Sequence, residues 1–302
     1  MNYYSDEKDW QWLFRNGIDW DKIIPLYYPT FPTEDGFNSK KDVIDFFEEI
    51  LQSTGEWTGT AVTERAAQLD KEGAGKVVDG RTIPGEALQA LYKEATELDS
   101  IGLPFPTELG GLGAPSAITL MLLAQLSRAC LASSTQMAFF TSIGEMIHRF
   151  CDEETAHRLV PKIARGELSG SMCLTEPGCG SDLGMIKTSA TPNEDGKYLL
   201  NGAKIFITNG GGGLGFVLAR IKGDKEGLAG ISLFLCEQEI EGQDKLNFRV
   251  TKNEEKMGMH GSFTTEVVYE NSVATLIGDA GKGFKYMLHL MNEARIAVGM
   301  QA

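Results

Sequence analysis

The hydrophobic period of this chain changes near Glu167, and this change limits its fold more than any other feature. Before Glu167, apolar residues recur at spacings of three and four, as between Val43 and Leu51, which is typical of amphipathic helices. After it, short β-branched and aromatic runs alternate with Asp-Gly and Asn-Gly pairs, which favour hairpin turns. We therefore predict an α+β chain, with helices first and strands second.

The predicted fold is an N-terminal all-α domain, then an antiparallel β-barrel or sandwich domain, then the first helix of a C-terminal helical bundle. The last segment, "GKGFKYMLHLMNEARIAVGMQA", returns to helical spacing and reaches Ala302 without a cap. We interpret this as a chain that ends inside a further helical domain, the alternative being a docked C-terminal helix. The predicted domains are an aromatic extension (1–34), a helical domain (35–168), a β domain (169–280) and the start of a helical domain (281–302).

Charge and cysteine content exclude several classes of protein. The 302 residues carry 28 basic and 42 acidic side chains, a net charge of −14, which argues against nucleic acid or an anionic membrane as a partner. The five cysteines form no CxxC pair, so we expect no disulfide framework. No run of eighteen apolar residues and no basic, apolar N-terminus occur, so we expect no membrane span and a cytoplasmic location.

Two motifs resemble known sites but lack the required context. Gly210, Gly212 and Gly215 satisfy G-x-G-x-x-G, yet the following "FVLARI" predicts a strand instead of the helix that dinucleotide binding needs, so we expect a flexible connection between strands. The pairs Glu145/His148 and Glu154/His157 imitate half of a di-iron site. Nine residues separate them, too few for two antiparallel bundle helices, so we predict no metal site.

The stretch "CLTEPGCGSD", from Cys173 to Asp182, is the strongest candidate site. A hydroxyl, a rigid Glu-Pro step and glycines that let backbone N–H groups approach a ligand precede a Ser-Asp pair. Further on, "KIFITNG" places Phe206 and Thr208 on one face of a strand, which would suit a flat heteroaromatic ring. From the residues alone, the prediction is a cofactor or ligand site in the β domain.

These two stretches resemble the flavin-contacting signatures of acyl-CoA dehydrogenases. "LPFPTELGGLG", "EEKMGMHGSFTTEVVYENSVATLIGDAGKGF" and "MNEAR" resemble other parts of that family, so the likeness covers most of the chain from Ile83 onward. The aromatic extension resembles the large bacterial branch that includes 3-methylmercaptopropionyl-CoA and long-chain enzymes. The resemblance implies FAD, an acyl-CoA substrate, a role in fatty acid metabolism, electron transfer flavoprotein as electron acceptor, and a homodimer or homotetramer at full length.

The resemblance also implies the roles of particular residues. The substrate-contacting residues would be Ser181, Asn292 and Arg295. The FAD-contacting residues would be Met172, Cys173, Leu174, Thr175, Gly180, Ser181, Phe206, Ile207, Thr208 and Arg295.

The catalytic base is the main departure from the family pattern. The reaction needs a carboxylate to remove the α-proton while the β-hydrogen leaves as hydride. Where the family carries this base on the first C-terminal helix, it precedes the arginine that matches Arg295, and this position holds Ala294. Glu293 is a weaker candidate because one helical step should turn its side chain elsewhere. Glu176 is expected to be structural, so we expect the base to lie beyond Ala302.

We therefore expect an FAD-dependent acyl-CoA dehydrogenase that is inactive as this 302-residue piece. Two alternatives stay open. One is a short, non-catalytic paralogue that binds flavin or acyl-CoA or acts as an assembly partner. The other is an acyl-CoA oxidase, which the same scaffold would allow.

Overall fold

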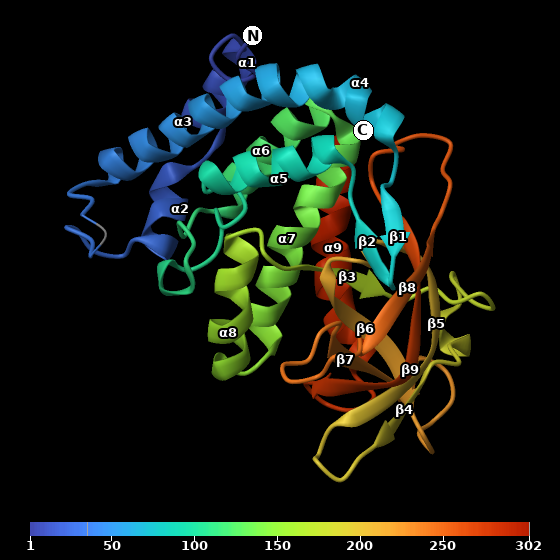
Figure 1. Ribbon diagram of the computed structural model, residues 1–302. Coiled ribbons are helices and arrows are strands. Elements are labelled where there is room, and N and C mark those ends of the chain that lie inside the picture. The colour runs from blue at the N-terminus through green and yellow to red at the C-terminus, as the bar shows by residue number, and fades with distance from the viewer. Residues whose placement is uncertain (35, 302) are drawn as a thin grey trace.

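The computed structural model describes residues 1–34 and 36–301, in which a helical part packs beside a strand-rich part (Figure 1). The helices are α1 (Lys8–Trp12), α2 (Trp20–Tyr27), α3 (Lys40–Trp57), α4 (Thr63–Glu72), α5 (Glu86–Glu97), α6 (Ser116–Ala129), α7 (Leu131–Phe150), α8 (Glu153–Ala164) and α9 (Gly283–Gln301). The strands are β1 (Lys76–Val78), β2 (Arg81–Ile83), β3 (Ser169–Cys173), β4 (Ser189–Pro192), β5 (Tyr198–Thr208), β6 (Gly213–Ile221), β7 (Ile231–Glu237), β8 (Phe248–Asn253) and β9 (Thr264–Ile277). The change of period near Glu167 therefore coincides with the step from α8 to β3.

The N-terminal aromatic segment is helical and packs into the core. Phe14, Trp20 and Ile24, on and next to α1 and α2, are buried. The predicted helix after Ser39 is confirmed as α3, whose first turn is held by a capping box. There the Ser39 hydroxyl accepts from the Asp42 N–H, and the Asp42 carboxylate accepts from the Ser39 N–H.

The helical part contains a β-hairpin, so the prediction that it is all-α was wrong at one place. Strands β1 and β2 pair antiparallel around Asp79-Gly80, where both residues have positive φ. The Asp-Gly pair is a hairpin signal that the helical pattern around it concealed. Gly80 O accepts from the Val250 N–H, so the hairpin docks on β8 of the strand-rich part.

The strand-rich part closes into a barrel. Strands β6, β4, β5, β9 and β7 pair in that order, and a further pairing between β6 and β7 completes the ring, with β3 and β8 attached outside it. The prediction of an antiparallel domain was partly wrong, because β6 pairs parallel with both β3 and β4. The Asp195-Gly196 turn joins β4 to β5, whereas Asn201-Gly202 lies inside β5 at a register shift.

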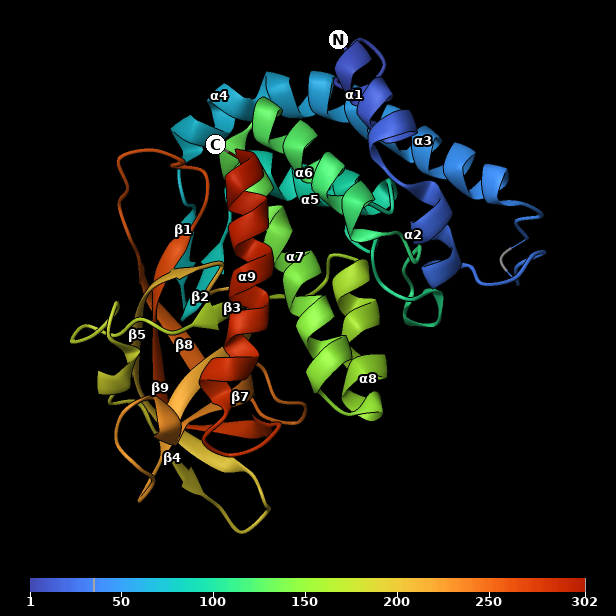
Figure 2. The same cartoon turned by 180° about the vertical axis from the view of Figure 1, so that it is seen from behind.

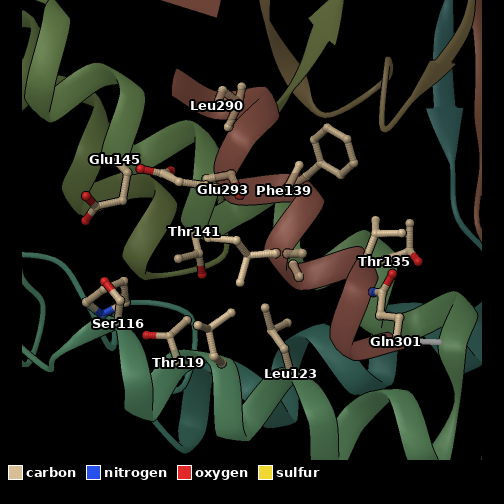
Figure 3. Close-up of a pocket in the computed structure, with 18 of the residues that line it drawn as sticks. Ser116, Thr119, Leu123, Thr135, Phe139, Thr141, Glu145, Leu290, Glu293 and Gln301 are labelled. Atoms are coloured by element: carbon tan, nitrogen blue, oxygen red, sulfur yellow. The ribbon is translucent and has the colours of Figure 1, made fainter. Parts of the chain in front are cut away.

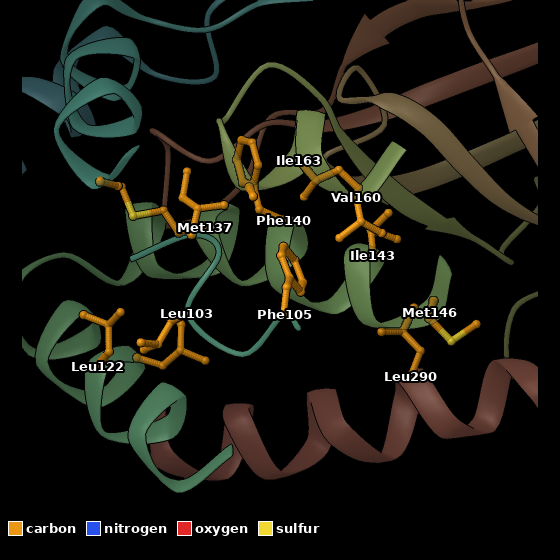
Figure 4. Packing of buried hydrophobic residues seen from close by; sticks show 14 of the residues in the cluster. Leu103, Phe105, Leu122, Met137, Phe140, Ile143, Met146, Val160, Ile163 and Leu290 are labelled. Atoms are coloured by element: carbon orange, nitrogen blue, oxygen red, sulfur yellow. The ribbon is translucent and has the colours of Figure 1, made fainter. Parts of the chain in front are cut away.

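The core of the helical part is continuous with the face of the barrel that α7 and α9 cover. Figure 4 shows Phe105 next to Phe140 and Ile143 of α7, with Leu103 between it and Leu122 of α6. A Cβ at Gly144 would come within 2.2 Å of the Phe105 ring, so glycine is needed for this close approach. This packing fixes α7, which supplies one wall of the cleft described below.

Helix α9 lies between the two parts of the molecule. Figure 2 shows it running beside α7 from the barrel toward the end of α6. Its buried residues are Gly283, Met287 and Leu290.

The Arg158 guanidinium of α8 also donates to both Glu237 carboxylate oxygens of β7, at 2.7 Å each. No helix of the described residues is both long and apolar enough to cross a membrane.

Candidate functional site

The loop from Cys173 to Asp182 leaves the end of β3 and folds back on itself. The N–H groups of Glu176 and Cys179 each donate to the other residue's carbonyl, at 2.9 and 3.1 Å. The Asp182 carboxylate accepts from the Gly184 N–H at 3.0 Å and begins a short 3-10 turn. The loop is therefore closed at both ends and presents its glycines outward.

Glu176 anchors this loop from beneath. Its carboxylate lies 2.9 Å from the Lys204 ammonium of β5 and accepts from the Lys187 and Thr188 N–H groups at 2.6 and 3.0 Å. Burial raises the pKa of Glu176, but the charge of Lys204 and these hydrogen bonds outweigh burial, so the net pKa is lowered. The prediction that Glu176 is structural agrees with this fully engaged carboxylate.

The same lysine joins the loop to the second predicted stretch. The Lys204 ammonium also donates to Leu174 O at 3.0 Å, and the Ile205 N–H donates to Thr175 O at 2.9 Å. The two stretches that the sequence singled out are therefore neighbours in space. This contact explains why "KIFITNG" has a lysine at a fully buried position.

Phe206 has an unusual backbone and is exposed. Its φ is +57°, a left-handed conformation that costs an L-residue about 1–2 kcal/mol. It lies at a register shift of β5, and 62% of its surface is exposed, whereas Ile207 is buried and Thr208 half-buried. An exposed aromatic ring held in a strained conformation is a candidate ligand contact.

The predicted cofactor contacts divide by the direction of their side chains. Cys173 and Ile207 are buried in the barrel core, where the Cys173 thiol accepts from the Tyr269 hydroxyl at 3.2 Å. Only the backbones of these two residues remain for a ligand. Met172, Leu174, Thr175 and Thr208 are half-buried, whereas Gly180, Ser181 and Phe206 are exposed.

Three consecutive backbone N–H groups, from Gly180 to Asp182, donate to no acceptor within residues 1–34 and 36–301. A Cβ at Gly178 would meet nothing within 4 Å, and one at Gly180 would touch only the Thr175 methyl at 3.4 Å. Internal packing therefore does not require either glycine. Free, successive N–H groups on an open glycine-rich turn suit an anion such as a phosphate.

A cleft of about 300 Å³ opens between α6, α7 and α9. Figure 3 shows Thr119 and Leu123 of α6, Phe139 and Glu145 of α7, and Leu290 and Glu293 of α9 around it. Met172 of β3, three residues before Thr175, also lines this cleft. The cleft therefore borders the strand that carries the predicted cofactor loop.

The C-terminal candidates lie on α9. The Arg295 guanidinium donates to the Asn292 amide oxygen at 2.7 Å, and both side chains are exposed. Glu293 and Ala294 both line the cleft, so the expectation that Glu293 points elsewhere was wrong. The cleft follows α9 from Leu290 to Gln301 and is wide enough to include adjacent positions of the helix.

The two motifs that were set aside have structural explanations. The predicted strand over "FVLARI" is confirmed as part of β6, but the glycines before it are tightly packed. A Cβ at Gly211 would lie 2.5 Å from Thr82 of the hairpin, so the glycine run is a packing surface and not a flexible connection.

The Glu-His pairs do lie on two packed helices, α7 and α8, contrary to the spacing argument. The described residues contain no group of three or more potential metal ligands.

Sequence reasoning did not identify Glu145 as a cleft residue. This glutamate lies on the otherwise mostly apolar helix α7 and lines the cleft. Burial first, and the charge of Glu293 second, raise its pKa to about 7, while Arg149 opposes the shift. The sequence does contain a signal for this position, because Glu145 is a carboxylate within the longest apolar region. The argument about a di-iron site considered Glu145 only as the partner of His148.

Comparisons with known proteins agree with this geometry. The family model described as "Acyl-CoA dehydrogenase, N-terminal domain" matches residues 47–167, and "Acyl-CoA dehydrogenase, middle domain" matches residues 171–272. An acyl-CoA dehydrogenase of Bacillus subtilis is 36% identical over 70% of this chain and 55% of its own length. The 3-methylmercaptopropionyl-CoA dehydrogenase of Ruegeria pomeroyi is 30% identical over 85% of this chain and 45% of its own length.

Solved structures extend the likeness to the fold. The structure of an acyl-CoA dehydrogenase complexed with FAD from Bacillus anthracis matches with a TM-score of 0.72 and 27% identity. The match covers 85% of this chain and 41% of that one. The chain spans about half the length of the curated relatives it matches.

Proposed function

This chain belongs to the acyl-CoA dehydrogenase family, and we propose that it forms the N-terminal and middle parts of an FAD-dependent enzyme that dehydrogenates acyl-CoA thioesters. The reaction would remove one hydrogen from the α-carbon and one from the β-carbon. Electrons would pass to an electron transfer flavoprotein, and the full-length protein would be a homodimer or homotetramer. The proposed domains are residues 1–34, 35–168, 169–280 and 281–302.

One observation carries the proposal: hydrogen bonds hold the loop after β3 next to the strained turn at Phe206, beside an apolar cleft. The Ile205 N–H and the Lys204 ammonium make the link, through Thr175 O, Leu174 O and the Glu176 carboxylate. A cofactor that spans the loop and the strand would therefore lie next to a ligand in the cleft. Adjacent cofactor and substrate sites are what hydride transfer requires.

The residues present fit FAD. The exposed ring of Phe206 offers a flat surface, and the half-buried hydroxyls of Thr175 and Thr208 offer hydrogen bonds to the edge of a heteroaromatic ring. The free N–H groups from Gly180 to Asp182 would hold a phosphate. FAD, when bound, would supply the ring that accepts the hydride leaving the β-carbon.

The remaining roles belong to side chains of this chain. Ser181 would contact the pantetheine or phosphate part of acyl-CoA, and Asn292 and Arg295 would hold substrate or cofactor from α9. Ala294 supplies no carboxylate for removal of the α-proton. Glu293, beside it on the cleft, stays the weaker candidate base on α9, because it stands one helical position away from the place where the family carries this carboxylate. Glu176 is excluded from this role because both its carboxylate oxygens already accept hydrogen bonds beneath the loop.

The test is FAD binding by calorimetry to the purified chain and to Gly180→Val. Valine at Gly180 would project its methyl groups over the open face of the loop, so we expect FAD affinity to fall at least about tenfold. The matched control is Gly258→Val, because a Cβ at Gly258 also meets nothing within 4 Å. Equal FAD affinity in all three proteins would refute the proposed cofactor site.

A second measurement addresses the reaction. After anaerobic addition of an acyl-CoA thioester to the FAD-loaded full-length protein, bleaching of the flavin absorbance would indicate dehydrogenation. Thr208→Val should slow this bleaching more than it weakens thioester binding, because its hydroxyl would act near the ring position that receives hydride. Rapid oxygen consumption in place of electron transfer to the flavoprotein acceptor would favour the oxidase alternative.

A further inference from the structure

Two carboxylates approach one another across the cleft. Figure 3 shows the Glu293 side chain reaching from α9 toward Glu145 on α7. Much of the surrounding surface is apolar, including Leu120, Leu123 and Phe139. An apolar cleft with two acidic groups on facing helices differs from a purely hydrocarbon-binding pocket.

Neither carboxylate has a partner in the part of the chain that the structure describes. No hydrogen bond or ion pair reaches Glu145 or Glu293, and Arg149, one turn beyond Glu145, makes none either. Glu145 is half-buried, whereas Glu293 is exposed. A half-buried carboxylate such as Glu145 without a partner is destabilising, and natural proteins keep such groups mainly where a ligand uses them. The cleft therefore offers hydrogen-bond acceptors to whatever enters it.

The charged groups around Glu145 help to explain the raised pKa of its carboxyl group. Glu293 opposes it from α9, and Arg149 lies on the same helix. His148 and Arg149 also line a second, adjoining cleft beside Tyr28 and Pro106. Burial and the charge of Glu293 raise the pKa of Glu145 to about 7, so any cation that enters between the two carboxylates replaces a repulsion with an attraction.

The cleft contains further unused polar atoms. The hydroxyls of Thr119 and Thr135 are buried, and neither has a hydrogen-bond partner within the described residues. Thr119 is only 9% exposed. Buried hydroxyls are normally satisfied, so these two atoms are a second, independent sign that a polar ligand belongs here.

Given the proposed function, on which this inference rests, we propose that Glu145 selects acyl groups that carry a hydrogen-bond donor, above all a protonated amine. A methyl-terminated chain would leave the Glu145 carboxylate without a partner. A chain that ends in a carboxylate would bring a third negative charge beside Glu145 and Glu293, against the single positive charge of Arg149, which also lines this cleft. An ammonium group would pair with the Glu145 carboxylate and reduce its repulsion with Glu293, while the methylene groups of the chain contact Leu123 and Phe139.

The experiment compares three CoA thioesters of similar length by calorimetry at about pH 8: 6-aminohexanoyl-CoA, heptanoyl-CoA and adipoyl-CoA. We expect the 302-residue protein, loaded with FAD, to bind the amino derivative about tenfold or more tightly than heptanoyl-CoA, and adipoyl-CoA most weakly. Glu145→Gln should reduce the preference to within about threefold, and Glu145→Leu should reverse it in favour of heptanoyl-CoA. Both variants remove a charge without a partner, so neither should impair folding.

Glu154→Gln is the matched control, because Glu154 is exposed at the start of α8 and lines neither cleft. It should keep the preference of the unmodified protein. Tighter binding of heptanoyl-CoA or adipoyl-CoA by the unmodified protein, or an unchanged preference in Glu145→Leu, would overturn the inference and leave the proposed function standing. Binding of all three thioesters no tighter than free CoA would overturn both.

Discussion

The Glu176 carboxylate and the Lys204 ammonium lie 2.9 Å apart and are almost completely buried, with side-chain exposures of 6% and 0%. Glu176 belongs to the loop after β3, and Lys204 belongs to β5, so this ion pair joins the two stretches that form the proposed cofactor site. A buried ion pair contributes little net stability compared with apolar residues, but removal of one partner is costly. Its main effect here is to fix the position of the loop.

Lys204→Met should destabilise the protein by about 3–5 kcal/mol, because the Glu176 carboxylate would stay buried with only its two backbone donors. Urea unfolding measures the change. Lys222→Met, at an exposed position of the same barrel, should change stability by less than about 0.5 kcal/mol. A loss below about 1 kcal/mol in Lys204→Met would mean that the ion pair does not anchor the loop.

The raised pKa of Glu145 predicts a specific pH dependence. The folded protein keeps the Glu145 proton up to about pH 7, whereas the unfolded chain releases it near the ordinary value of 4.5. The stability linked to this proton is therefore fully present below pH 4.5 and is lost as the pH rises through about 7. Glu145→Gln, which cannot ionise, should remove this dependence.

Thermal unfolding at pH 6 and pH 8.5 tests this expectation, because both values stay clear of the sequence pI of 4.8. We expect Glu145→Gln to raise Tm by roughly 2–4 °C at pH 8.5 and by a smaller amount at pH 6, where only part of the stability linked to the Glu145 proton has been lost. Glu154→Gln should show no such difference between the two pH values. A variant that is less stable than the unmodified protein at pH 8.5 would contradict the assigned environment of Glu145.

Gly211→Ala should destabilise the contact between the β1–β2 hairpin and the barrel. Its Cβ would lie 2.5 Å from both the Cβ and the hydroxyl of Thr82, which forces one backbone to move. We expect a loss of about 1–3 kcal/mol in urea unfolding. Gly258→Ala, where a Cβ meets nothing within 4 Å, should be neutral or slightly stabilising. Equal stability of the two variants would show that the hairpin docks loosely.

Local sequence patterns predicted the order and type of most elements. The helical spacing from Val43 to Leu51 became α3, and the runs after Glu167 became the strands of a barrel. These predictions succeeded because a periodic apolar face reflects which side of a single element is buried. The glycine-rich "CLTEPGCGSD" loop was likewise recognisable, since its residue types are unusual for a loop that only connects two elements.

Only the tertiary structure decided which of these elements meet. It paired β6 parallel with β3 and β4, docked the Asp79-Gly80 hairpin on β8, and placed Lys204 under the loop of Glu176. It also brought Glu145 and Glu293, 148 positions apart, to the same cleft. Periodicity describes one element at a time, so it carries no information about partners that are distant in sequence. The sequence therefore determined the segments and the candidate loop, and packing between distant segments determined the sheet order, the anchor of the loop and the charge in the cleft.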